Sequence, residues 1–127
     1  MSETQQTRVV AIVDDIFFAS KIREAAKSAQ VNIEIFKNPD GIIESLTNAV
    51  FTLIIVDLDS KKFNSLKIIE KLKTREDAKD ISTLGYLSHV QENLKNEAIK
   101  AGYDSVMPRS RFSRELISIL KKHLVHK

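Results

Sequence analysis

Short apolar runs rich in β-branched residues alternate along this chain with longer stretches in which apolar residues recur at helical spacing. The runs predict strands at residues 9–13, 31–35, 53–56, 81–88 and 105–107. The stretches between and after them predict helices at residues 16–29, about 39–47, 66–72, 94–101 and 112–124. Strict alternation of strand and helix is typical of a mostly parallel sheet that helices cover on both faces.

The way such units connect limits the order of the strands. Right-handed crossovers leave few topologies for five strand–helix pairs. One of them is the doubly wound, flavodoxin-like sheet with strand order 2-1-3-4-5, and we expect this chain to adopt that (βα)5 α/β fold. In such sheets ligands bind beyond the carboxyl ends of the strands, at the point between strands 1 and 3 where the order reverses. A site is therefore expected where strands 1 and 3 end.

The length of 127 residues fits one compact domain, which we expect to span residues 1–127 with a core of about 8–124. No apolar run is long enough to cross a membrane. Residues 1–7 are polar and lack the features of a signal peptide, so we expect a cytoplasmic protein. The chain has no cysteine, which excludes a disulfide scaffold, a thiolate metal site and a cysteine nucleophile.

Three carboxylates stand at the ends of strands that are neighbours in the expected sheet. Asp14 and Asp15 follow the first strand, and Asp57 follows the third. Like charges at close range raise one another's pKa, and a bound divalent cation relieves the repulsion. Oxygen ligands without cysteine or histidine suit Mg²⁺, which accepts one or two carboxylates and engages phosphate oxygens. The acids therefore predict a Mg²⁺ site, although an acid at a strand end is also common as a helix N-cap.

Two further side chains are expected at the same edge of the sheet. Ser88 ends the fourth strand and offers a hydroxyl donor, and Arg109 follows the fifth strand and offers a positively charged fork for phosphate. Beside Mg²⁺, the carboxylate of Asp57 can act as a nucleophile toward a phosphate donor, while the metal neutralises charge on the transferring group. The set predicts phosphoryl chemistry at Asp57.

At these residues the chain resembles the receiver domain of two-component response regulators, over about residues 8–124. Val-Asp-Asp at 13–15 is similar to the acidic pair of that family, and Ile-Val-Asp-Leu at 55–58 is similar to the strand that carries its phosphoacceptor. Ser88 stands where the family has a serine or threonine that senses the phosphoryl group. Ala-Gly-Tyr-Asp at 101–104 is similar to the stretch that precedes the family's fifth strand.

The resemblance implies a stand-alone response regulator in phosphorelay signal transduction, which is no enzyme beyond its own phosphorylation and dephosphorylation. Asp57 would accept a phosphoryl group from a histidine kinase or a phosphotransfer protein. Asp15 and Asp57 would bind Mg²⁺ directly with the backbone carbonyl of Asp59, and Asp14 would act through water. The surface formed by the predicted helix at 94–101, the strand at 105–107 and the helix at 112–124 would bind a downstream protein or form a homodimer.

Several positions depart from the family pattern. The Lys-Pro pair after the fifth strand is Arg109-Ser110 here, and arginine is no neutral replacement for lysine. The aromatic residue of the fifth strand, whose ring moves with the phosphoryl sensor, is Val106. His89 occupies a place beside the phosphate that a small residue usually holds. A second hypothesis therefore stays open, in which the chain is a pseudo-receiver that acts as a protein-interaction module without phosphorylation.

The formal net charge is +3, and the positive excess lies in the last segment, where six basic residues stand against the single acid Glu115. From Met107 onward these are Arg109, Arg111, Arg114, Lys121, Lys122 and Lys127. A solvated face of the last helix is the first interpretation of this cluster. It could also meet an acidic partner or nucleic acid, and nucleic-acid binding is a third and less expected hypothesis.

Overall fold

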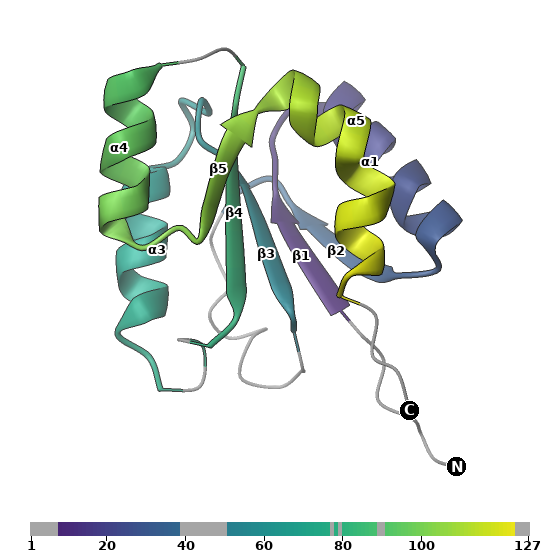
Figure 1. Ribbon diagram of the computed structural model, residues 1–127, viewed down its shortest axis with the longest axis horizontal. Helices are drawn as coiled ribbons and strands as arrows, with labels where there is room; N and C mark the ends of the chain where they lie inside the picture. Colours follow the sequence, from purple (N-terminus) through teal and green to yellow (C-terminus); the bar gives the residue numbers. More distant parts are fainter. Residues whose placement is uncertain (1–7, 39–50, 77, 79, 89–90, 124–127) are drawn as a thin grey trace.

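The computed structural model describes residues 8–38, 51–76, 78, 80–88 and 91–123. In this part of the chain, parallel strands form one sheet in the order β2-β1-β3-β4-β5 (Figure 1), which confirms the predicted topology. The strands are β1 (Arg8–Ile12), β2 (Asn32–Phe36), β3 (Leu53–Asp57), β4 (Ser82–Leu87) and β5 (Ser105–Pro108). Each strand overlaps its predicted range almost completely.

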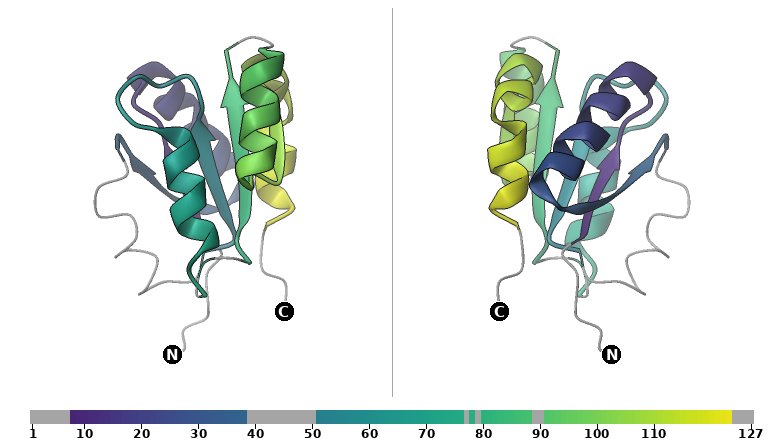
Figure 2. Two further views of the ribbon diagram at one scale, coloured as in Figure 1. Left: turned by 90° about the vertical axis from the view of Figure 1, so that its left-hand side faces the viewer. Right: turned by 90° about the vertical axis from the view of Figure 1, so that its right-hand side faces the viewer.

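Helices cover both faces of the sheet (Figure 2). The described helices are α1 (Ile16–Ala29), α3 (Ser65–Lys73), α4 (Glu92–Ala101) and α5 (Arg109–Lys121). α1 and α5 pack together on one face, and α3 and α4 pack together on the other. The helix predicted at about 39–47 lies outside the described residues. None of the described helices is long and apolar enough to cross a membrane.

The start of α5 differs from the prediction. Pro108 ends β5 and is also the N-cap of α5, so the helix begins directly after the strand. Proline has a fixed φ and no N–H group, and both properties suit an edge strand and the entry to a helix. Arg109 therefore stands in the first helical turn rather than in a loop.

The central strand β3 is buried along its whole length, because it lies inside the sheet between the two helical layers. One hydrophobic cluster fills the space between the sheet and α1 and α5, and a second fills the space between the sheet and α3 and α4. Ile55 belongs to the first cluster, whereas Ile54 and Val56 belong to the second. Because side chains alternate along a strand, Asp57 lies on the same face as Ile55, toward α1 and α5.

Capping residues determine where two helices begin. Asp15 caps α1 and Asn64 caps α3, and each side chain accepts hydrogen bonds from two backbone N–H groups of the first turn. Gly102 ends α4 with a φ of 130°, a backbone conformation that favours glycine. The two N-caps fix the chain at the carboxyl edge of the sheet, where the candidate site lies.

Candidate functional site

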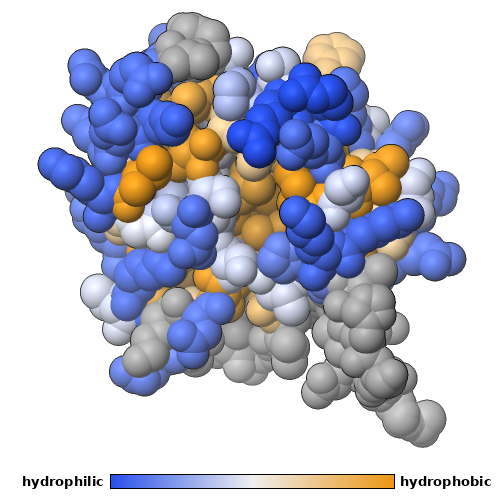
Figure 3. Space-filling model, in the orientation of Figure 1, coloured by the Kyte–Doolittle hydropathy of each residue, from blue (hydrophilic) through white to orange (hydrophobic). Residues whose placement is uncertain are grey.

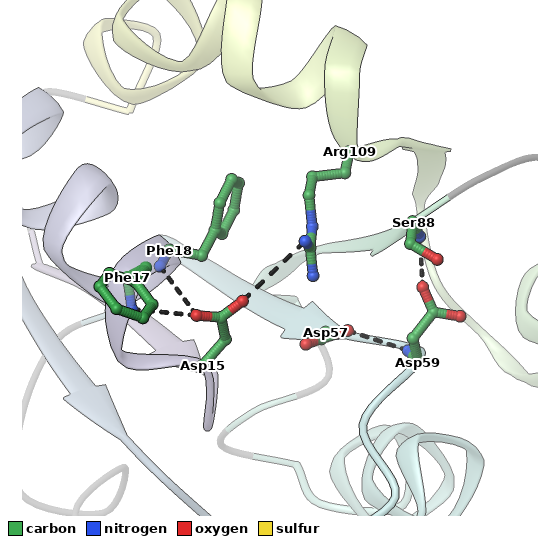
Figure 4. Close-up of polar contacts among 7 residues, drawn as sticks. All are labelled: Asp15, Phe17, Phe18, Asp57, Asp59, Ser88 and Arg109. Atoms are coloured by element: carbon green, nitrogen blue, oxygen red, sulfur yellow. Dashed lines mark hydrogen bonds and ion pairs between the residues drawn. The ribbon is translucent and has the colours of Figure 1, made fainter.

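Acidic side chains gather at the carboxyl edge of the sheet, beyond β1 and β3 (Figure 4). β1 and β3 are adjacent and parallel, and Ile12 pairs with Val56. Asp57 is the last residue of β3, and Asp14 and Asp15 follow β1. The structure therefore brings these three acids to the same edge of the sheet.

Asp57 is the most buried of these acids, with 3% of its surface exposed. One oxygen of its carboxylate accepts a hydrogen bond of 2.9 Å from the backbone N–H of Asp59. Burial raises the pKa of Asp57, and the negative charges of Asp59 and Asp14 raise it further. The hydrogen bond from Asp59 and the positive charge of Arg109 act in the opposite direction. The folded protein therefore disfavours the ionised form of Asp57, and a bound cation would stabilise that form.

The two carboxylate oxygens of Asp15 have different contacts. Oδ1 caps α1 by accepting hydrogen bonds from the N–H groups of Phe17 at 2.9 Å and Phe18 at 3.2 Å. Oδ2 faces Arg109, whose Nη1 atom is 3.9 Å away. The cap therefore fixes the orientation of the carboxylate while its second oxygen faces the guanidinium (Figure 4).

Hydrogen bonds tie the loop after β3 to both neighbouring strands. Ser60 donates a hydrogen bond of 3.2 Å to Asp14, which joins this loop to the end of β1. The carboxylate of Asp59 accepts hydrogen bonds from the backbone N–H of Ser88 and, at 3.0 Å, from Nε2 of Gln91. The sequence predicts a role only for the backbone carbonyl of Asp59, whereas its side chain holds the β3–α3 and β4–α4 loops together.

Arg109 extends from the first turn of α5 toward the acids (Figure 4). Its guanidinium carbon lies 4.9 Å from the ring centre of Phe18 and 5.7 Å from that of Tyr86, within the range of cation–π contacts. The rings of Phe18, Tyr86 and Phe112 form one aromatic cluster with centres 5.0–6.0 Å apart. A positive charge in the first turn of a helix opposes the helix dipole. Such departures from local preference are expected at functional sites.

The donor set fits a hard divalent cation. Asp14, Asp15 and Asp57 offer only oxygen ligands, which Mg²⁺ prefers over the ligands of softer metals. No three acidic or histidine side chains of the described residues form a ready-made metal cluster. Mg²⁺ does not need one, because it is commonly bound through one or two carboxylates, waters and phosphate oxygens. Burial raises the pKa of Asp57 and the negative charges of Asp59 and Asp14 raise it further, so the site has a physical reason to bind such an ion.

The other predicted site residues, Arg109, Ser88 and His89, differ in how they relate to the acidic site. Arg109 reaches it with its side chain, whereas the backbone N–H of Ser88 is bound by the carboxylate of Asp59. His89 lies outside the described residues. Tyr86 lies beside Asp57 at this site, and the sequence does not single it out, since a tyrosine inside an apolar strand is typical of the core. Its position next to the acids follows only from the register of β3 and β4, in which it pairs with Asp57.

The sequence matches no protein-family model and no curated protein. The fold, in contrast, is similar to solved receiver domains. A CheY-like response regulator receiver domain from Methanospirillum hungatei is 13% identical with a TM-score of 0.76, and the match covers 94% of this chain and 93% of that one. A signal receiver domain from Bermanella marisrubri is 21% identical with a TM-score of 0.76, covering 94% of this chain and 98% of that one.

A third similar structure is the Mn²⁺-bound form of the response regulator Rcp1, which is 15% identical with a TM-score of 0.73. The match covers 91% of this chain and 89% of that one. Because identity is low in each pair, the likeness lies in the path of the backbone rather than in the side chains. The chain therefore has the receiver-domain fold, in agreement with the family that its motifs resemble.

Proposed function

We propose that this chain is a response regulator receiver that accepts a phosphoryl group on Asp57 in a Mg²⁺-dependent reaction and then alters its binding to another protein. The observation that carries the proposal is the burial of Asp57 at the carboxyl edge of the sheet, in the field of Asp14, Asp59 and Arg109. The donor is the phosphohistidine of a histidine kinase or of a phosphotransfer protein. The receiver-domain fold supports this choice of donor.

The transfer requires a nucleophile and compensation of the phosphate charge. An oxygen of the Asp57 carboxylate forms a bond to phosphorus while the phosphorus–nitrogen bond of the phosphohistidine breaks, and the leaving imidazole takes up a proton. Asp15, Asp57 and the backbone carbonyl of Asp59 would hold Mg²⁺, with Asp14 acting through water, and the ion supplies charge neutralisation. Arg109 contributes a positive charge from the chain itself.

The output surface of this proposal is the face of α4, β5 and α5, which Figure 3 views directly. Hydrophobic side chains are visible there among hydrophilic ones. Ile99 on α4 and Ile117 on α5 are 47% and 43% exposed, and Val106 on β5 is half-buried. Because Arg109 begins α5, a change in its position on phosphorylation would be felt at this face, where a downstream protein or a second copy of the chain binds.

Two observations favour a second function. Val106 packs against the hydrophobic cluster beneath α3 and α4 and offers no ring to a switch. The carboxylate of Asp59 also holds the backbone N–H of Ser88, next to the pocket, without any phosphoryl group. These features suit a pseudo-receiver that keeps one conformation and serves as a protein-interaction module. The two functions differ in whether Asp57 is phosphorylated.

Incubation with acetyl phosphate and Mg²⁺, followed by intact mass measurement, distinguishes the two functions. We expect the wild-type chain to gain the mass of one phosphoryl group, and we expect Asp57→Asn to gain none. Asp80→Asn changes an exposed acid next to the amino end of β4, so this control should behave as the wild type. No adduct on the wild type, or an adduct that survives Asp57→Asn, would exclude the first function and leave the interaction module.

A further inference from the structure

The chain has two tyrosines, Tyr86 and Tyr103, and both are buried, with 0% and 3% of their surfaces exposed. The hydroxyl of Tyr103 donates a hydrogen bond of 2.9 Å to the backbone carbonyl of Ser65. The hydroxyl of Tyr86 has no hydrogen-bond partner among the residues that the structure describes. A buried hydroxyl without a partner lowers the stability of the fold, so its presence calls for an explanation, and binding of a ligand is one.

Tyr86 lies directly beside Asp57 in the sheet. Paired residues of adjacent parallel strands project from the same face, so both side chains lie toward α1 and α5. The ring of Tyr86 stacks on Phe112 with centres 5.0 Å apart and an interplanar angle of 8°, and it tilts against Phe18 with centres 5.0 Å apart. The guanidinium carbon of Arg109 lies 5.7 Å from the same ring centre. These neighbours fix the ring and therefore the direction of its hydroxyl.

The charges that act on this hydroxyl are those of the candidate site. Burial raises the pKa of Tyr86, and the negative charge of Asp57 raises it further. Asp15 and Asp14 contribute in the same direction, whereas Arg109 opposes them. The phenol therefore stays protonated at neutral pH and can donate a hydrogen bond but carries no charge.

We propose that the Tyr86 hydroxyl is a phosphoryl-binding group, which donates a hydrogen bond to an oxygen of the phosphoryl group on Asp57. The inference rests on the proposed function and adds a residue to it that the motifs of the resembled family do not include. Phosphorylation gives Asp57 new acceptor oxygens of high charge. A donor that is already fixed and desolvated loses little entropy and little hydration when it meets such an acceptor. Tyr86 thus adds a directional contact to the positive charge of Arg109.

Binding of beryllofluoride, a mimic of the phosphoryl group, tests this role in the presence of Mg²⁺. The three proteins to compare are the wild type, Tyr86→Phe and the matched control Tyr103→Phe. Fluorine NMR measures the dissociation constant of beryllofluoride for each protein. The constant for Tyr86→Phe should be roughly 10- to 100-fold larger than that of the wild type, because the variant loses one hydrogen bond to a charged acceptor. Tyr103→Phe should bind as the wild type does, because its hydroxyl lies on the other face of the sheet.

Melting temperatures without ligand separate this role from a structural one. Tyr86→Phe should melt at or above the temperature of the wild type, because it removes a buried group that has no partner. Tyr103→Phe should melt lower, because it removes the buried hydrogen bond from the tyrosine hydroxyl to the carbonyl of Ser65.

Three outcomes would overturn the inference. Equal affinity of Tyr86→Phe and the wild type for beryllofluoride would do so while leaving the proposed function intact. A melting temperature of Tyr86→Phe well below that of the wild type would do so as well, since the hydroxyl would then be a structural group. Failure of the wild type to bind beryllofluoride and to gain a phosphoryl adduct would overturn the proposed function, and this inference with it.

Discussion

At the amino end of β4, the side chains of Thr83 and Asp104 are hydrogen-bonded to each other's residue. At its carboxyl end, the hydroxyl of Tyr86 and Nε of Arg109 are buried and have no hydrogen-bond partner within the described part of the chain. The Thr83 N–H donates to the Asp104 carboxylate at 2.9 Å, and the Asp104 N–H donates to the Thr83 hydroxyl at 2.9 Å. The Thr83 hydroxyl itself lies 3.2 Å from that carboxylate. At the carboxyl end, burial raises the pKa of Asp57 instead.

This difference separates polar groups that support the fold from polar groups that are kept for a ligand. Reciprocal hydrogen bonds between Thr83 and Asp104 stabilise the start of β4 and β5. Buried groups without partners cost stability, and a role in catalysis or ligand binding is one established reason for a native protein to retain them. Variants at the amino end of β4 should therefore lose stability, whereas variants at its carboxyl end should lose phosphorylation or phosphoryl binding without losing stability.

The largest effect is expected at Arg109. Arg109→Ala removes the positive charge that acts on Asp57 and should slow phosphorylation by acetyl phosphate roughly 100-fold, as measured by intact mass over time. The free energy of unfolding should change by no more than about 1 kcal/mol, because the ion pair with Asp15 is long and partly exposed. Arg111→Ala, at an exposed residue paired with Glu115, is the control. A phosphorylation rate of Arg109→Ala close to that of the wild type would contradict a role in phosphorylation for the polar groups at the carboxyl end of β4.

The opposite pattern is expected at Asp104. Asp104→Ala removes the carboxylate that accepts from Thr83 and should lower the free energy of unfolding by about 1–3 kcal/mol in urea denaturation. The phosphorylation rate of the folded variant should equal that of the wild type. The exposed neighbour Ser105 provides the control Ser105→Ala. If phosphorylation of folded Asp104→Ala slowed as much as that of Arg109→Ala, the polar groups at the two ends of β4 would not have the different roles that we assign to them.

A smaller effect concerns the pH dependence of stability in metal-free buffer. Because burial raises the pKa of Asp57, the folded state binds this proton more tightly than the unfolded chain does. Stability therefore falls as pH rises from the ordinary carboxyl value of about 3.9 through the raised value, and the full penalty is present only above that raised value.

Asp57→Asn lacks this penalty, so calorimetry at neutral pH should give it a melting temperature a few degrees above that of the wild type. The difference should shrink on acidification, because the wild-type carboxyl then becomes neutral in both states. Asp80→Asn should follow the wild type at every pH, since this acid is exposed. A melting temperature of Asp57→Asn below that of the wild type at neutral pH would show that the buried charge is not destabilising.

The fold and the positions of the acids could be predicted because both follow from the order of elements along the chain. Asp57 ends the most apolar run, and Asp14 and Asp15 end the first run, so parallel pairing alone makes them neighbours. The strand order likewise follows from alternation and the hand of the connections.

The aromatic cluster and the side-chain role of Asp59 could not be predicted, because both depend on contacts between distant elements. Phe18, Tyr86 and Phe112 come from α1, β4 and α5, and each is typical of a core residue when read alone. The carboxylate of Asp59 reaches the β4–α4 loop, whose position relative to β3 depends on strand register. The aromatic cluster and the Asp59 contacts therefore depend on the register between strands and not on the local sequence pattern.

Titration of the metal-free protein with Mg²⁺, followed by backbone NMR, tests most directly whether acids from β1 and β3 share one cation-binding pocket. We predict shifts concentrated at Asp14, Asp15, Asp57 and Asp59, their loss in Asp57→Asn, and further shifts in α4 and α5 when beryllofluoride is added. Shifts that are absent from these four residues, or that persist unchanged in Asp57→Asn, would contradict a shared pocket.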